Sequence, residues 1–372
     1  MPSRAVLPEA GGIAKVARLF FRGDPSRMSA EIRTDVVVIG AGPVGLFALF
    51  ELGMLKLRAA VVDTLDMPGG QCAALYPEKP IYDIPGCPSI LAGELVERLV
   101  KQAEPFQPSY HLGQQVTGLA RGEDGLWHLE TSKGTRLAAT AVVIAAGAGA
   151  FGPNRPPLEG LPLYEGRGDG TGVHYLVRRR EDFRGKRLVI AGGGDSALDW
   201  TVSLAEVAAK IYVVHRRPQF RGAPEMVARM QALAAAPGGK VELVVPYQLA
   251  GLAGQDGRLT GVEVKTLEGQ ARLLEADALL AFFGLSMNLG PIAKWGLALD
   301  QHHLTVDPAT CETSAPGIFA IGDIATYPKK LKLILSGFAE AAQAAHAIRP
   351  LCRPGEVLHW EYSTTAGVPT AS

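Results

Sequence analysis

Residues 34–45 read TDVVVIGAGPVG, an apolar run that leads directly into a glycine-rich turn. The β-branched run over 34–39 predicts a buried strand, and the stretch Val44–Leu55 after the glycines predicts a helix. A second apolar strand is predicted at Ala59–Val62. The order strand, glycine turn, helix and strand is that of a βαβ unit, so this region predicts a parallel sheet.

The turn carries the spacing G-x-G-x-x-G, formed by Gly40, Gly42 and Gly45. Glycines at this spacing allow a tight turn and a close approach of the backbone to a pyrophosphate at the helix N-terminus. Asp63 follows 18 residues after Gly45, at the end of the second strand. A carboxylate there can accept a hydrogen bond from a ribose hydroxyl. The region therefore predicts a dinucleotide site.

The same arrangement recurs about 150 residues later in the chain. A strand is predicted at Leu188–Ile190, a helix at Ser196–Ala209 and a second strand at Ile211–Val214. The turn between the first strand and the helix has the variant spacing G-x-G-x-x-A, which falls on Gly192, Gly194 and Ala197. The chain thus contains two dinucleotide-binding openings.

The second opening differs from the first in the charge that follows it. Position 18 after Ala197 is His215, and Arg216, Arg217 and Arg221 come next. A carboxylate at this place would repel a 2′-phosphate, whereas guanidinium groups bind phosphate through paired hydrogen bonds. The second site is therefore predicted to take NADP(H) rather than NAD(H), the alternative being a solvated basic strand end.

The length of 372 residues favours two domains. Strands of a meander are predicted after each opening, at Gln115–Leu119, Leu126–Glu130 and Arg136–Ile144, and at Lys240–Val245, Gly261–Thr266 and Ala271–Leu279. Two Gly/Pro-rich stretches, Gly147–Pro157 and Gly284–Pro291, are interpreted as two crossings of one boundary. The expected fold is α/β, with two Rossmann-like domains, one inserted into the other. The expected parts are an N-terminal extension (1–32), a discontinuous first domain (33–150 and 285–372) and an inserted domain (151–284).

Charge and composition exclude several classes of protein. Lys+Arg and Asp+Glu are both 37, so a general nucleic-acid binder is not expected. No run reaches the roughly 18 apolar residues of a membrane span, and charges interrupt the apolar stretch Ala14–Arg22. The sequence thus predicts a soluble, cytoplasmic protein without a membrane partner. The four cysteines form no C-x-x-C and suggest no metal site.

Residues Thr313–Asp323 resemble the second FAD fingerprint of flavoproteins with two dinucleotide domains. The layout is near that of the low-molecular-weight thioredoxin reductases, which need a C-x-x-C just before the second glycine turn. The corresponding stretch, Gly168–Tyr175, contains no sulfur. Another resemblance is carried by the segments Pro68–Gln71, Leu75–Lys79, Tyr82–Gly86, Gly172–Tyr175, Gly193–Trp200, Lys330–Ile334 and Tyr362–Thr364. With these segments, the chain from about residue 33 resembles the thioredoxin-reductase-like ferredoxin–NADP(+) reductases.

The resemblance implies FAD in the first site and assigns it further contacts. The implied FAD-binding residues are Asp63, Gln71, Tyr76, Val116, Phe151, Asp323 and Thr364. Tyr76 is expected to stack on one face of the isoalloxazine, since aromatic rings favour offset stacking, and Tyr362 to cover the other face. No catalytic side chain is expected, because the cofactors carry the redox chemistry.

The function implied by the resemblance is hydride transfer between NADPH and FAD N5, followed by single-electron exchange with ferredoxin or flavodoxin, in a homodimer. Two alternatives stay open: an NADPH-dependent diaphorase, or quinone or iron reductase, and a flavin-binding regulatory module. Because ferredoxins are generally acidic, a basic docking patch is expected. The favoured patch is Lys329, Lys330 and Lys332, beside Asp323, and the other candidate is the run Arg178–Arg180 with Arg184, Lys186 and Arg187.

Overall fold

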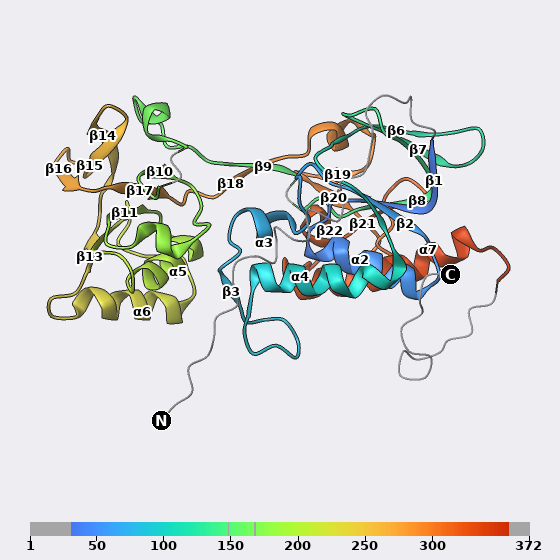
Figure 1. Ribbon diagram of the computed structural model, residues 1–372, viewed down its shortest axis with the longest axis horizontal. Helices are drawn as coiled ribbons and strands as arrows, with labels where there is room; N and C mark the ends of the chain where they lie inside the picture. Colours follow the sequence, from blue (N-terminus) through green and yellow to red (C-terminus); the bar gives the residue numbers. More distant parts are fainter. Residues whose placement is uncertain (1–30, 148, 167–168, 357–372) are drawn as a thin grey trace. The chain divides into compact units, whose positions relative to one another are not determined.

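The computed structural model describes residues 31–147, 149–166 and 169–356, and the chain divides into two compact units (Figure 1). Unit 1 comprises Met1–Ala150 and Met287–Ser372, and unit 2 comprises Phe151–Ser286. The second crossing thus lies two residues after the place expected from the sequence. Each crossing carries a short strand, β9 (Ala150–Pro153) and β18 (Leu285–Asn288), and these two strands pair with each other.

Unit 1 is built on a seven-stranded sheet in the order β5-β2-β1-β8-β7-β6, with β21 paired to β8. Its strands are β1 (Ile32–Ile39), β2 (Ala59–Val62), β5 (Ser109–His111), β6 (Val116–Arg121), β7 (Trp127–Thr131), β8 (Arg136–Ile144) and β21 (Ile318–Ala320). The pairs β1–β2, β1–β8, β2–β5 and β21–β8 are parallel, whereas β6–β7 and β7–β8 are antiparallel. The first predicted meander is confirmed as β6, β7 and β8.

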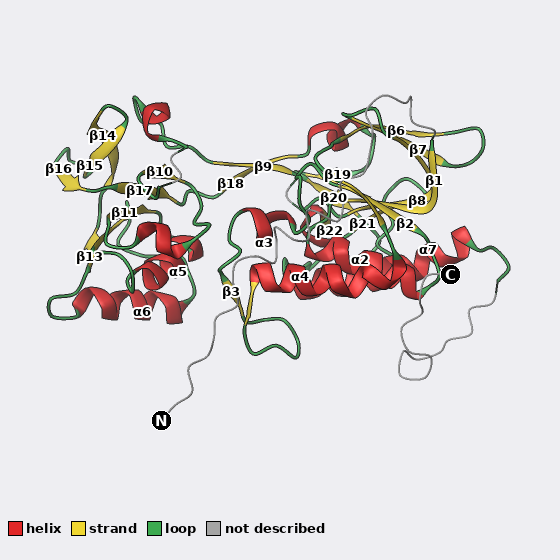
Figure 2. Cartoon of the chain, viewed as in Figure 1, coloured by secondary structure: helices red, strands yellow, loops and turns green. Residues whose placement is uncertain are grey.

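The two faces of this sheet bury alternate residues of the central strand. Val36 and Val38 point into a core shared with three helices, α2 (Pro43–Met54), α4 (Ala92–Ala103) and α7 (Ile334–Cys352), which lie together in Figure 2. Val37 and Ile39 point into a second core on the other face. Because both faces are covered, β1 is apolar without alternation, which is why the sequence shows a continuous apolar run.

Shorter elements of unit 1 lie between these. They are α3 (Gly70–Ala74), β3 (Pro80–Ile81), β4 (Ile90–Leu91), η1 (Glu104–Phe106), η4 (Gly290–Lys294), β19 (Leu299–Asp300), β20 (His303–Thr305), η5 (Gly322–Ile324) and β22 (Ala325–Thr326). Within the described ranges, no helix is both long and apolar enough to cross a membrane. The same ranges contain no group of three or more His, Cys, Asp or Glu side chains that could hold a metal ion.

Unit 2 contains a five-stranded parallel sheet in the order β10-β17-β11-β12-β13, and a separate antiparallel sheet, β14-β15-β16. The parallel strands are β10 (Gly172–His174), β11 (Arg187–Ala191), β12 (Lys210–Val214), β13 (Val241–Val244) and β17 (Ala278–Ala281). The antiparallel strands are β14 (Gln248–Gln255), β15 (Arg258–Lys265) and β16 (Ala271–Glu275). The helices are α5 (Asp195–Leu204) and α6 (Pro224–Ala235), and short 3₁₀ turns lie at η2 (Leu161–Tyr164) and η3 (Arg180–Phe183).

The second predicted meander is wrong in two respects. The strand predicted at 240–245 belongs to the parallel sheet as β13, and the stretch predicted as one strand at 271–279 is two strands in different sheets. Apolar runs of this length look alike in either kind of sheet, which explains the error. The sequence reading also missed β14, whose composition of Gly, Ala, Leu and Gln has little β-propensity.

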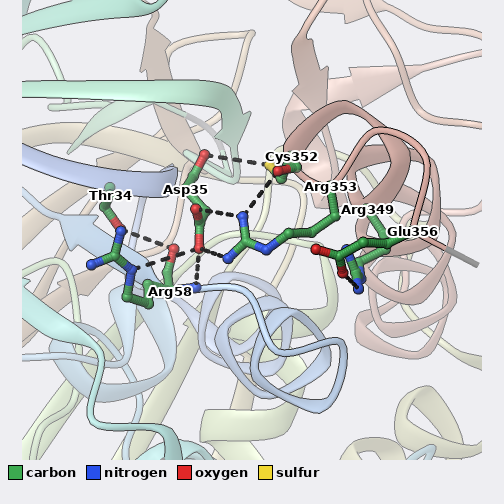
Figure 3. A network of polar contacts seen from close by, with 7 residues as sticks. All are labelled: Thr34, Asp35, Arg58, Arg349, Cys352, Arg353 and Glu356. Atoms are coloured by element: carbon green, nitrogen blue, oxygen red, sulfur yellow. Dashed lines mark hydrogen bonds and ion pairs between the residues drawn. The ribbon is translucent and has the colours of Figure 1, made fainter. Parts of the chain in front are cut away.

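A buried carboxylate fastens the C-terminal helix α7 to the start of the sheet (Figure 3). Asp35 in β1 accepts two parallel hydrogen bonds from the Arg353 guanidinium, each 2.9 Å long, and one of 2.8 Å from the amide of Arg58. The Cys352 thiol lies 3.7 Å from the Asp35 carbonyl oxygen. Burial by itself raises the pKa of Asp35, but Arg353 and Arg58 together lower it below its ordinary value.

Asp35→Asn is expected to lower the free energy of unfolding by about 1.5–3 kcal/mol at pH 7, the range for hydrogen bonds to a charged group. The lowered pKa of the folded state makes this contribution present above the unfolded-state pKa of about 4. It is lost as the pH falls through the folded-state pKa. Urea unfolding of both proteins between pH 7 and pH 3 should therefore show a gap in stability that narrows toward the acid end. A gap independent of pH would contradict the ionic contribution.

Candidate functional site

The first glycine turn connects β1 to α2 and is shaped by contacts that no side chain could share. Gly40 has a φ of +110°, and a Cβ there would lie 2.4 Å from the carbonyl oxygen of Ala145. A Cβ on Gly45 would lie 2.0 Å from the carbonyl oxygen of Gly40. A Cβ on Gly42, which caps α2, would meet nothing within 4 Å. The turn thus packs tightly against backbone atoms at Gly40 and Gly45 but leaves space at Gly42, beside the first amides of α2. A pyrophosphate fits at such a helix N-terminus.

Asp63, at the end of β2, braces this turn. Its Oδ2 accepts a 2.6 Å hydrogen bond from the amide of Ala41, and its Oδ1 a 2.8 Å bond from the amide of Leu65. Burial raises the pKa of Asp63, while these amides act in the opposite direction. A carboxylate has about four lone-pair sites, and the amides of Ala41 and Leu65 take two of them. The residue fits the predicted contact and also shapes the loop.

A second turn of unit 1 meets the first one. Gly322 has a φ of +74°, and Asp323 is exposed between the buried residues Gly322 and Ile324. Built Cβ atoms on Gly322 and on Gly337 of α7 would lie 3.5 and 2.3 Å from the Val44 side chain. The Gly40–Gly45 turn, the Gly322–Asp323 turn and the start of α7 therefore converge. Such a cradle could hold FAD, with the amides after the Gly40–Gly45 turn suited to its pyrophosphate.

The other predicted FAD contacts belong to the same unit. Gln71 lies in α3 and Tyr76 just after it, both half-buried, while Val116 is buried at the start of β6. Burial raises the pKa of Tyr76, and the neighbouring charges that act in the same direction include Asp323. Phe151 lies in β9, and Tyr362 and Thr364 lie outside the described residues.

The sequence reading missed Glu340 of α7, which holds the Gly322 turn from behind. Its side chain is 2% exposed, and Oε2 accepts a 2.8 Å hydrogen bond from the amide of Gly322. Oε1 accepts a 2.8 Å bond from the Tyr327 hydroxyl and pairs with the ammonium of Lys330. The only sequence signal was one acid within an apolar helix, and such an acid needs a partner.

These contacts correct the predicted lysine patch. The Lys330 side chain is 5% exposed and forms an ion pair with Glu340, so it is not a surface charge. The Lys332 ammonium lies 2.8 Å from His303 Nε2. Three arginines of the other candidate patch form ion pairs within unit 2. These are Arg180–Glu206 (2.9 Å), Arg184–Glu181 (2.6 Å) and Arg187–Asp277 (2.9 Å). Lys330 is thereby removed from the predicted surface patch, while Lys329 and Lys332 stay exposed.

All four cysteines are free. Burial raises the pKa of Cys72 and of Cys352 to about 11, and that of Cys311 to about 12. These three thiols are therefore protonated near neutral pH and are poor nucleophiles. Cys72 instead lies 4.0 Å from the Tyr76 hydroxyl. Thiol–disulfide chemistry thus has no support in the described part of the chain.

The second glycine turn, in unit 2, repeats the design of the first. Gly192 has a φ of +152°, and a Cβ there would lie 2.7 Å from the carbonyl oxygen of Phe282 and 3.2 Å from Ala197 Cβ. A Cβ on Gly194, which caps α5, would meet nothing within 4 Å. Here too the backbone packs tightly at the first glycine, Gly192, and leaves space at Gly194, beside the first turn of the helix.

His215 lies over the second turn. Its imidazole stacks on Phe220 with ring centroids 5.3 Å apart, and a Cβ on Gly193 would lie 2.3 Å from the ring. Burial lowers the pKa of His215, and the nearby arginines add to that effect, so the ring is neutral at pH 7. Its Nε2 is buried without a hydrogen-bond partner. An unpaired polar atom beside a glycine turn fits a ligand contact.

The segment after β12, residues 215–223, is here called the arginine loop. Arg216, Arg217 and Arg221 are exposed on it. Within the described residues, none of the three side chains forms an ion pair with an acid, in contrast to the arginines of residues 180–187. Three uncompensated guanidinium groups beside a phosphate turn are suited to an additional phosphate.

Comparison with known proteins agrees with this geometry. A family model described as pyridine nucleotide-disulphide oxidoreductase matches residues 34–347. The chain is 63% identical to a protein named ferredoxin–NADP reductase from Paramagnetospirillum magneticum, over 91% of this chain and 99% of the relative. It is 61% identical to a protein of the same name from Rhodospirillum rubrum, over 92% and 98%. A thioredoxin reductase of Lactococcus lactis shares the fold, with a TM-score of 0.72 at 22% identity, over 86% of this chain and 99% of that one.

Proposed function

Because the chain belongs to the pyridine nucleotide-disulphide oxidoreductase family, we propose that it is an FAD-dependent ferredoxin–NADP reductase. Unit 1 binds FAD between the Gly40–Gly45 and Gly322–Asp323 turns. Unit 2 binds NADP(H) on the Gly192–Ala197 turn. Bound FAD supplies the redox chemistry, since it can take a hydride from NADPH and give electrons singly to an iron–sulfur protein.

The observation that carries this proposal is the pair of glycine turns, each leaving free space at the first amides of a helix, followed by residues of opposite charge. The first turn is followed by Asp63, which suits a ribose hydroxyl. The second is followed by Arg216 and Arg217, which suit the 2′-phosphate of NADP(H). Around these turns the side chains orient cofactors rather than transfer protons.

The raised thiol pKa values of Cys72, Cys311 and Cys352, and the lack of a C-x-x-C motif in the sequence, favour a one-electron acceptor over a disulfide. The acceptor is a ferredoxin, as the names of the relatives indicate, or a flavodoxin. The enzyme acts in the cytoplasm as a homodimer, as the family resemblance implies.

Purified holoprotein is expected to be yellow, and its flavin absorbance should bleach on anaerobic addition of NADPH. The rate of cytochrome c reduction should then be higher with ferredoxin present than without it, because ferredoxin carries electrons from the reduced enzyme to cytochrome c. A protein that reduces dyes and quinones but gains nothing from ferredoxin would be the alternative diaphorase. A flavin that NADPH does not bleach would indicate a binding module without turnover.

A further inference from the structure

Two hydrogen bonds fasten the arginine loop to the second glycine turn. Asp195, the first residue of α5, accepts a 2.9 Å hydrogen bond from the amide of Ala223 through Oδ1. The amide of Arg221 donates a 2.7 Å bond to the carbonyl oxygen of Gly193. The loop that carries the exposed arginines is therefore held at its far end by the turn itself.

The loop packs closely against α5 at Gly222, with no room for a side chain. A Cβ on Gly222 would lie 2.2 Å from Leu198 Cδ1 and 3.0 Å from Asp195 Oδ1. The near end of the loop is held as well, because the amide of His215 bonds to the carbonyl oxygen of Val244 and its ring covers Gly193. With both ends fixed, the arginines between them stand at a set distance from the phosphate turn.

Asp195 is otherwise a poor residue for its position. A carboxylate in the first turn of a helix stabilises that helix, but it repels an anion that binds at the same helix N-terminus. Its hydrogen bond to the amide of Ala223 indicates that the residue holds the arginine loop in place.

We propose that Asp195 is a positioning residue for coenzyme selectivity: it anchors the arginine loop so that the arginines reach a 2′-phosphate. The inference rests on the proposed NADP(H) function. Loosening the loop removes discrimination between coenzymes that differ only in the 2′-phosphate. The repulsion between Asp195 and the shared pyrophosphate affects both coenzymes equally and cancels in their ratio.

The test compares Asp195→Ala with Asp195→Asn in the holoprotein. Asparagine keeps an oxygen that can accept the Ala223 amide, whereas alanine does not. The kcat/KM ratio for NADPH over NADH, measured by dye reduction, should fall about three- to tenfold in Asp195→Ala, the scale of one hydrogen bond, and stay near wild type in Asp195→Asn. Calorimetric binding of adenosine 2′,5′-bisphosphate relative to AMP should change in parallel.

A double-mutant cycle separates positioning from general damage. In a background of Arg216→Ala, Arg217→Ala and Arg221→Ala, Asp195→Ala should cost no further selectivity, because the groups it positions are gone. Gly222→Ala, which crowds the same contact without changing charge, should lower the ratio as Asp195→Ala does, and it serves if Asp195→Ala fails to fold. An unchanged ratio in Asp195→Ala and Gly222→Ala, with wild type still preferring the bisphosphate, overturns the inference. A wild type without that preference overturns the proposed NADP(H) function.

Discussion

Lys330→Met is expected to lower the free energy of unfolding by roughly 3–5 kcal/mol, because it leaves the Glu340 carboxylate buried without its charged partner. The two side chains are 5% and 2% exposed, so water cannot replace the lost ammonium. Since Glu340 also accepts the amide of Gly322, the Gly322–Asp323 turn should loosen and flavin should be released earlier. Urea unfolding of the holoprotein, followed by circular dichroism and by flavin fluorescence, measures both effects.

Lys329→Met is the matched control, since Lys329 is exposed and adjacent in sequence. It should leave both unfolding curves unchanged. The double variant Lys330→Met with Glu340→Gln should recover much of the loss, because the stranded charge is removed while an amide oxygen still accepts the Gly322 amide. If Lys330→Met unfolds like Lys329→Met, the pair contributes nothing and the lysine is free for another role.

Lys330 also illustrates what sequence reasoning could and could not reach. The run of lysines after the flavin fingerprint is visible in the sequence, but burial depends on where α7 lies. Glu340 is 10 residues away, and only the packed structure places its carboxylate beneath the loop. The placement of Lys330 in a surface patch is therefore wrong for a reason of packing: a buried acid in an apolar helix takes the nearest cation as its partner.

The glycine turns were predictable for the opposite reason. Their geometry is fixed locally, because Gly40 and Gly45 stand where a Cβ would collide with backbone oxygen atoms. The strand–turn–helix order of both openings is confirmed, and so is the two-domain α/β fold. The second predicted helix is too long, however, since α5 ends at Leu204 rather than Ala209. The anchoring of the arginine loop by Asp195 was not predictable, because it joins residues 28 positions apart.

The double variant Arg216→Ala with Arg217→Ala is expected to lower the kcat/KM ratio for NADPH over NADH at least tenfold. Each charge-assisted contact with phosphate contributes about 1.5–3 kcal/mol before solvent screening reduces it. The loss should fall on NADPH, mainly through its KM, and leave NADH nearly unaffected, because NADH has no 2′-phosphate. Steady-state reduction of a small dye measures both coenzymes without requiring the protein acceptor.

The matched control removes the same charge from the same unit. Arg180 and Arg184 are paired with Glu206 and Glu181, so Arg180→Ala with Arg184→Ala should leave the ratio unchanged. If the arginines only attracted coenzyme to unit 2 by their general positive charge, the kcat/KM ratio would fall equally in the two double variants. An unchanged kcat/KM for NADPH in the Arg216 and Arg217 variant would remove these residues from the site. A loss confined to that variant would instead assign selectivity to Arg216 and Arg217, which pair with no carboxylate among the described residues.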